Sequence, residues 1–154
     1  MVAALDATRR KHDLELWAYV VMPEHVHLLI YPTQKMYDIS KILTTLKQPV
    51  AKKATLLVQR EAPGFAGRMT DRQPNGKVSL RFWDRGGGYD RNLWSPAYVW
   101  ETIDYIHHNP VRRGLCDSPV DWHGSSAVAY HSDEECPLAL DLHSLPDDPR
   151  SAVR

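Results

Sequence analysis

The stretch MPEHVHLLI, residues 22–30, joins two strand-like runs and carries two histidines. The run before it, residues 14–21, is rich in aliphatic and aromatic residues, and Pro23 prevents that run from continuing. Two such runs joined by so short a corner are expected to pair as an antiparallel hairpin. We therefore predict one strand over residues 14–21 and a return strand over residues 25–31.

The return strand places its two histidines on one face. Side chains alternate between the faces of a strand, so His25 and His27 share one side, and Val26, Leu28 and Ile30 are expected to enter the core on the other. Neutral imidazoles are common metal ligands, so the pair could hold a divalent ion. Taken alone, a His-x-His pair also fits two polar residues on a solvated strand face.

Two helices flank the predicted hairpin. Residues 2–13 have helical composition and a basic end, which suits a helix C-terminus. Residues 38–58 carry apolar residues at helical spacing, and Asp38 or Ser40 can cap the start. Pro49 is expected to kink or interrupt this second helix.

A loop, a strand and a third helix follow. Residues 60–77 are rich in Gly, Pro, Arg and Asn and indicate a mobile loop, and residues 78–83 alternate like a strand. Ser95-Pro96 is a favoured helix start, and Asn109-Pro110 is expected to end that helix. Its buried stripe is expected to contain Val99, Ile103 and Ile106.

The end of the third helix, YIHHNPVRRGL at residues 105–115, offers a nucleophile. Tyr105 and Asn109 are four residues apart and therefore share a helix face. A tyrosine hydroxyl is a weak nucleophile and needs help, which a metal held by the two histidines and a third ligand could give by polarising a phosphodiester. Tyr105 could then attack phosphorus and retain one DNA end. The alternative is that its ring simply packs against the sheet.

Length and composition indicate an ordinary globular protein. The chain has 154 residues, 43% of them hydrophobic and 25% charged, which suits one domain with a real core. No apolar run is long enough to span a membrane, and no signal peptide opens the chain. The two cysteines lack metal-pair spacing, so reduced thiols and a cytoplasmic location are expected.

Charge is unevenly distributed although the formal net charge is zero. Residues 41–91 contain eleven basic and four acidic residues, whereas residues 131–149 contain six acidic residues and no Lys or Arg. This pattern suggests a phosphate-binding surface followed by an acidic tail, residues 131–154, that is expected to be disordered. Scattered surface charge is the alternative interpretation. The basic residues that we expect to contact DNA are Lys41, Lys47, Lys52, Lys53, Arg81, Arg85, Arg112 and Arg113.

The two motifs together, MPEHVHLL at residues 22–29 and YIHHNPVRRGL at residues 105–115, resemble those of IS200-like single-tyrosine transposases of the His-hydrophobe-His superfamily. The REP-associated tyrosine transposases are the most similar branch, which also shares shorter motifs at residues 82–83, 88–92, 121–122 and 125–126. The resemblance covers residues 3–130, so we expect residues 1–130 to form a single transposase domain.

The resemblance implies an α+β fold with a ferredoxin-like antiparallel sheet and helices on one face. It implies that His25, His27 and Asn109 bind Mg²⁺ or Mn²⁺, and that Tyr105 forms a 5′-phosphotyrosine intermediate. The expected partner is single-stranded or hairpin DNA. Relatives that exchange the tyrosine helix imply that either a monomer or a homodimer is possible.

One departure from the family pattern concerns the start of the chain. Relatives usually have a strand before the first helix, whereas this sequence begins at the helix, so the sheet is expected to lack its first strand. A start placed too far downstream and a decayed or rearranged copy are both compatible with this. The alternatives to a transposase are a truncated, inactive module that binds single-stranded or hairpin DNA, and a metal-dependent hydrolase that uses water as its nucleophile.

Overall fold

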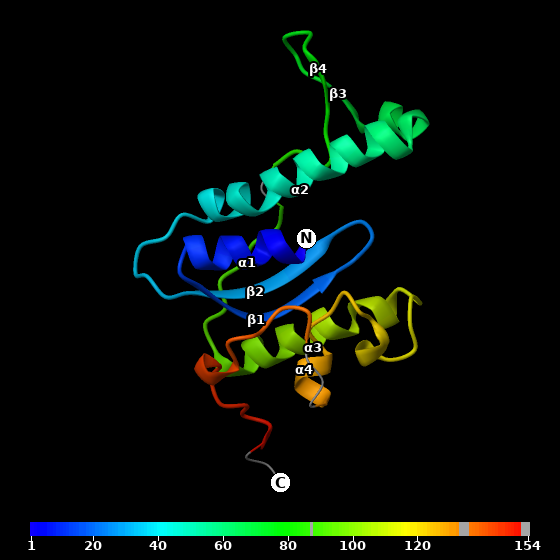
Figure 1. Ribbon diagram of the computed structural model, residues 1–154. Coiled ribbons are helices and arrows are strands. Elements are labelled where there is room, and N and C mark those ends of the chain that lie inside the picture. The colour runs from blue at the N-terminus through cyan, green and yellow to red at the C-terminus, as the bar shows by residue number, and fades with distance from the viewer. Residues whose placement is uncertain (87, 133–135, 152–154) are drawn as a thin grey trace. The chain divides into compact units, whose positions relative to one another are not determined.

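The computed structural model of the protein describes residues 1–86, 88–132 and 136–151 (Figure 1). The chain divides into two compact units. The first contains residue 1 and residues 3–8 and 38–90, and the second contains residue 2 and residues 9–37 and 91–154. The first helix, α1 (Val2–Lys11), therefore contributes to both.

The predicted hairpin is confirmed in the second unit. Strand β1 (Leu14–Val21) pairs antiparallel with β2 (Val26–Pro32). The Met22 N–H donates a hydrogen bond to the His25 carbonyl over 2.8 Å, which closes the corner between them. This short connection fixes the register, so that Val21 lies opposite Val26, with His25 directly before β2 and His27 opposite Val20 within it.

Helix α3 (Pro96–Arg112) packs against this hairpin. The Ser95 side chain caps it by accepting a hydrogen bond from the Tyr98 N–H over 3.3 Å, as the Ser-Pro start predicts. The predicted buried stripe of α3 is confirmed. Its three residues join five from the hairpin in one apolar core: Trp17, Ala18, Val20, Met22, Leu29, Val99, Ile103 and Ile106.

The prediction of which face of β2 enters the core is wrong. Leu29, which alternation places on the same face as His25 and His27, is the β2 residue in this core, whereas Val26, Leu28 and Ile30 are only half-buried. The reason is that α3 covers the face that carries the histidines. The two imidazoles therefore lie at the rim of a packed interface rather than on a solvated face opposite the core.

Helix α3 also continues past its predicted end. Pro110 lies inside the helix, which ends at Arg112. A proline interrupts the hydrogen-bond ladder at its own nitrogen, but its carbonyl remains an acceptor. Here that carbonyl accepts hydrogen bonds from the Arg113 N–H over 3.2 Å and the Leu115 N–H over 3.0 Å, so the last turn closes around it.

The second edge of β1 is bonded by residues from later in the chain. The Val21 N–H donates to the Gly124 carbonyl over 2.7 Å, and the Ser126 N–H donates to the Tyr19 carbonyl over 3.0 Å. The Trp122 indole donates to the Val21 carbonyl over 2.9 Å, which holds this later segment against β1. Short helices η2 (Pro119–Asp121) and α4 (Val128–His131) flank this segment.

The described part of the acidic tail is packed, contrary to the predicted disorder. Residues 133–135 and 152–154 lie outside the described residues. Between them, Asp141 pairs with Arg9 over 2.7 Å and accepts a hydrogen bond from the Leu16 N–H over 2.8 Å. The Trp17 indole donates to Ser144, within η3 (Leu142–Ser144), over 2.9 Å. The acidic residue that composition assigns to solvent thus serves as an acceptor for the edge of β1.

The first unit contains α2 (Ile39–Glu61), η1 (Pro63–Met69), β3 (Thr70–Arg72) and β4 (Val78–Leu80). Asp38 caps α2 by accepting from the Lys41 N–H over 3.1 Å, and the helix runs through Pro49 without interruption. The predicted loop at residues 60–77 is partly wrong, because it contains η1 and β3. The predicted strand is shorter than expected and pairs with β3.

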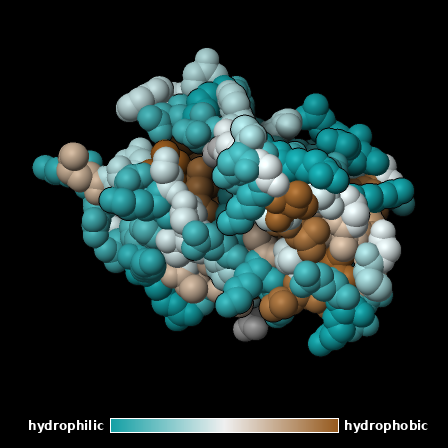
Figure 2. Space-filling view, turned by 90° about the horizontal axis from the view of Figure 1, so that it is seen from above, coloured by the Kyte–Doolittle hydropathy of each residue, from teal (hydrophilic) through white to brown (hydrophobic). Residues whose placement is uncertain are grey.

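The α+β class is confirmed by the mixture of helices and small antiparallel sheets. In the described parts of the chain the strands pair two by two, β1 with β2 and β3 with β4, so a larger ferredoxin-like sheet remains a prediction. The surface seen in Figure 2 is mostly hydrophilic, with separate hydrophobic patches. None of the described helices is long and apolar enough to cross a membrane.

Candidate active site

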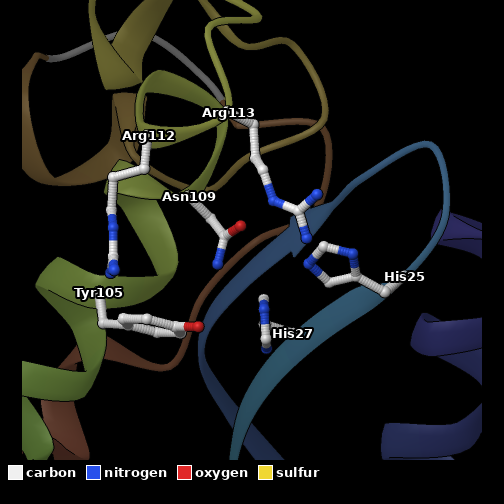
Figure 3. Close-up of a pocket in the computed structure, with 6 residues that line it drawn as sticks. All are labelled: His25, His27, Tyr105, Asn109, Arg112 and Arg113. Carbon is white, nitrogen blue, oxygen red and sulfur yellow. The ribbon is translucent and has the colours of Figure 1, made fainter.

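A pocket of about 360 Å³ lies where the start of β2 meets the C-terminal turns of α3 (Figure 3). It belongs entirely to the second unit. Two sequence motifs that are far apart along the chain supply its lining. The pocket therefore brings together the predicted nucleophile, the three predicted metal ligands and two predicted DNA contacts: Tyr105, His25, His27, Asn109, Arg112 and Arg113.

The rings of the two histidines and the tyrosine form a chain of edge contacts. His25 and His27 have ring centroids 4.7 Å apart, and the centroids of His27 and Tyr105 are 5.4 Å apart. Both pairs are nearly perpendicular, at 79° and 76°. Tyr105 remains 45% exposed, so its hydroxyl is accessible to a ligand in the pocket. In Figure 3 that hydroxyl points toward His27.

His27 is held as a neutral imidazole at neutral pH. Its pKa is lowered from the ordinary value by burial, and further by the positive charges that His25 and Arg113 would place nearby. A neutral imidazole keeps a lone pair on one ring nitrogen, and that lone pair is what a metal ion requires. The environment of His27 therefore favours the form that can act as a ligand.

Asn109 is buried one helical turn after Tyr105, with 6% of its surface exposed. In Figure 3 its amide lies between the Tyr105 ring and the Arg113 guanidinium and points into the pocket. The position follows from helical spacing, because residues four apart lie above one another on a helix. Its carbonyl oxygen is thus available as an oxygen donor beside the two imidazoles.

Two arginines at the end of α3 make the pocket positive. The Arg112 guanidinium lies over the Tyr105 ring, 5.0 Å from its centroid. Arg113 is placed by Glu24, whose carboxylate is 3.1 Å from its Nη1 atom and 3.4 Å from Nδ1 of His25. Sequence reasoning missed Glu24, although a carboxylate directly before the first histidine of the pair could have suggested it.

The donor atoms fit a divalent ion that accepts both nitrogen and oxygen ligands. Two imidazoles and one amide carbonyl converge on the pocket, and its volume leaves room for water to complete a coordination shell. In the described parts of the chain, no group of three or more His, Cys, Asp or Glu side chains is placed to hold a metal. The candidate metal ligands therefore carry little negative charge. Such a set suits an open site in which an anionic ligand also coordinates the ion.

The other six predicted DNA contacts belong to the first unit. Several of them already have partners: Arg81 and Arg85 both pair with Asp71, over 2.7 and 2.6 Å, and Lys41 pairs with Asp38 over 3.4 Å. Lys47 lies over the Trp83 ring, 5.8 Å from its centroid. Lys52 and Lys53 are exposed on α2.

A buried polar cluster supports α3 behind the pocket. His107 is 2% exposed, and its Nε2 atom lies 2.9 Å from the Ser126 hydroxyl. That hydroxyl also accepts from the Tyr19 N–H over 2.8 Å, so the three residues link α3 to β1. Burial lowers the pKa of His107 to about 4, which keeps its ring neutral. The sequence gives no signal that separates this structural histidine from the exposed His108 beside it.

No protein-family model matches the chain. A putative REP-associated tyrosine transposase of Haemophilus influenzae (strain ATCC 51907 / DSM 11121 / KW20 / Rd) is 24% identical over 131 residues, which cover 85% of this chain and 67% of that protein. A solved structure of a REP-associated tyrosine transposase bound to a REP hairpin matches the fold with a TM-score of 0.51 and 22% identity, over 94% of this chain and 76% of that one. In sequence and in fold, the chain resembles REP-associated tyrosine transposases.

Proposed function

We propose that this protein is a transposase of the single-tyrosine type, which cuts and rejoins one DNA strand with Tyr105 as its nucleophile. The observation that carries the proposal is the contact between Tyr105 and His27, 5.4 Å apart at their ring centroids, in a pocket that also contains His25, Asn109 and two arginines. A nucleophile, metal ligands and phosphate-binding cations are the three components that this reaction needs.

The strand exchange conserves bonds. The Tyr105 hydroxyl gives its proton to water as its oxygen attacks phosphorus, the bond from phosphorus to the 3′-oxygen of the preceding nucleotide breaks, and the released 3′-oxygen takes a proton from water. The product is a 5′-phosphotyrosine. Attack by a 3′-hydroxyl reverses the step and frees Tyr105. Because one phosphoester replaces another, no external energy source is needed.

The side chains of the pocket have distinct roles in this scheme. His25, His27 and Asn109 would hold Mg²⁺ or Mn²⁺, which when bound polarises the phosphodiester as a Lewis acid. Arg112, over the Tyr105 ring, is placed to stabilise negative charge as the tyrosine loses its proton. Arg113 can bind a phosphate oxygen through its planar guanidinium.

We propose single-stranded or hairpin DNA as the substrate. The support is the cationic pocket, the basic residues of the first unit, and the resemblance to a transposase that was solved bound to a REP hairpin. Lys41, Lys47, Lys52 and Lys53 on α2, with Arg81 and Arg85 after it, would add affinity that depends on salt. The cytoplasm, where DNA and reduced thiols occur together, is the proposed location.

An adduct assay tests the proposal. The protein is incubated with a labelled hairpin oligonucleotide that carries a single-stranded flank and with Mn²⁺, and is then run on a denaturing gel beside Tyr105→Phe and Tyr98→Phe. Tyr98 is a matched control, since it is exposed on the same helix but does not line the pocket. We expect a shifted band with wild type and Tyr98→Phe only. An adduct that persists in Tyr105→Phe contradicts the assignment.

The same gel separates the two alternatives. DNA cleavage without a covalent band, unaffected by Tyr105→Phe, would indicate a hydrolase that uses water. Binding of the hairpin with neither cleavage nor adduct, by a folded protein with Mn²⁺ bound, would indicate a DNA-binding module.

A further inference from the structure

The Glu24 carboxylate connects two residues of the candidate active site although it does not line the pocket itself. One oxygen, Oε1, lies 3.4 Å from Nδ1 of His25 and 3.1 Å from Nη1 of Arg113. Glu24 occupies the corner between β1 and β2, where its side chain is 52% exposed. A single carboxylate oxygen thus faces a predicted metal ligand and a predicted phosphate ligand together.

The contact with His25 favours one of the two tautomers of its ring. The nearby carboxylate oxygen, 3.4 Å from Nδ1, repels a lone pair and attracts an N–H, so it favours the hydrogen of a neutral His25 ring on Nδ1. The lone pair is then on Nε2. Carboxylates that bind the second nitrogen of a metal-ligating histidine fix its orientation in this way, and their loss lowers metal affinity.

The contact with Arg113 holds a cation at the edge of the pocket. In Figure 3 the Arg113 guanidinium lies beside the His25 ring. A guanidinium in this place would repel a metal ion unless a carboxylate balanced its charge. A phosphate that enters the pocket would offer Arg113 a second anionic partner.

We propose that Glu24 is a positioning residue of this site, which orients His25 toward a metal ion and holds Arg113 ready for the DNA phosphate. This inference rests on the proposed function for the identity of the metal and phosphate ligands. Glu24 touches neither ligand and acts through the two side chains that do. An exposed ion pair without further consequence is the contrasting interpretation, since such pairs contribute little to stability.

Mn²⁺ binding in the absence of DNA provides the main test. Free Mn²⁺ is measured by electron paramagnetic resonance while it is titrated into wild type, Glu24→Ala, Glu24→Gln and the control Glu101→Gln, an exposed glutamate on α3. We expect Glu24→Ala to lose about tenfold or more in affinity. Glu24→Gln should retain more, because its amide oxygen can still accept from Nδ1, and Glu101→Gln should match wild type.

A second readout uses the metal-free protein. Long-range ¹H–¹⁵N spectra identify which His25 nitrogen carries hydrogen, and we expect Nδ1–H in wild type and a mixture of tautomers in Glu24→Ala. Arg113→Gln supplies the opposite control: it removes the competing cation and should weaken DNA binding without lowering Mn²⁺ affinity. Circular dichroism confirms that each variant is folded.

The outcomes separate this inference from the proposed function. Mn²⁺ affinity unchanged in Glu24→Ala, the same His25 tautomer in both proteins, or no Mn²⁺ binding by wild type would each overturn the role of Glu24. A loss of Mn²⁺ affinity in Glu24→Ala combined with no covalent adduct on Tyr105 would keep Glu24 as a positioning residue and reject the transposase chemistry.

Discussion

The Tyr105 ring meets the His27 ring edge to face, with centroids 5.4 Å apart and planes at 76°. This contact joins the first motif of the sequence to the second. It exists because α3 packs on the face of β2 that carries the histidines, where Leu29 anchors the interface. The proposed nucleophile and a proposed metal ligand are therefore neighbours as a consequence of ordinary core packing.

Replacing either histidine should weaken metal binding without unfolding the chain. His25→Gln and His27→Gln remove one of two imidazoles from a site with few charged ligands, so we expect Mn²⁺ affinity to fall by about tenfold or more. Calorimetric titration checks this. His143→Gln, at a histidine whose side chain is 76% exposed, is the matched control and should bind Mn²⁺ normally. Equal losses in all three variants would argue against the site.

Arg112 should contribute to DNA affinity through charge. If its guanidinium contacts one phosphate, Arg112→Gln lowers the slope of log affinity against log salt by about 0.7 to 0.9. Fluorescence anisotropy with a labelled hairpin at several salt concentrations measures that slope. Lys11→Gln, at an exposed cation at the end of α1, should leave it unchanged. An unchanged slope for Arg112→Gln would remove this residue from the DNA surface.

His107 should make folding stability depend on pH. Its pKa of about 4 in the folded protein lies below the ordinary 6.5, so the unfolded chain binds a proton more readily than the native one. The contribution of the neutral His107 ring to the free energy of unfolding is fully present above pH 6.5. It is lost as the pH falls toward 4, and this loss amounts to up to about 3 kcal/mol. Urea unfolding at pH 7 and pH 4.5 measures the loss. His107→Gln should be less stable at pH 7 but less sensitive to pH, and an equal sensitivity would be contrary to this account.

Gly124 should tolerate no side chain. A Cβ there would lie 2.9 Å from both the Val21 carbonyl oxygen and Nε1 of Trp122, two atoms that are hydrogen-bonded to each other. Gly124→Ala must push them apart, and we expect a loss of about 1 to 3 kcal/mol in the free energy of unfolding. Gly64→Ala, where a Cβ meets nothing within 4 Å, should not be destabilised. Equal stability of the two variants would refute the steric argument.

Local patterns predicted the hairpin and the start of α3 because their causes are local. A short proline-containing corner fixes antiparallel pairing, and a Ser-Pro cap fixes where α3 begins. The face of β2 that enters the core was not predictable in this way. Alternation separates Leu29 from Leu28 but does not say which face a helix from later in the chain will cover.

The packing of the tail could not be predicted either. Composition assigns the acidic residues to solvent, whereas Asp141 accepts from Arg9 and from the Leu16 N–H, far away in the sequence.

The site was partly predictable: helical spacing places Asn109 beside Tyr105, but the proximity of Tyr105 to His27 was inferred from chemistry and resemblance. The Arg113 contact of Glu24 and the Ser126 contact of His107 depend on tertiary packing that no spacing rule encodes.

The site of covalent attachment tests the central claim most directly. The protein–DNA adduct formed with Mn²⁺ is digested with protease and nuclease, and the modified peptide is sequenced by mass spectrometry. We predict a nucleotide phosphate on the peptide that contains Tyr105, attached to that tyrosine. Attachment at Tyr98 or at any other residue, or no modified peptide from a folded protein that binds both Mn²⁺ and the hairpin, would contradict the assignment of Tyr105 as the nucleophile.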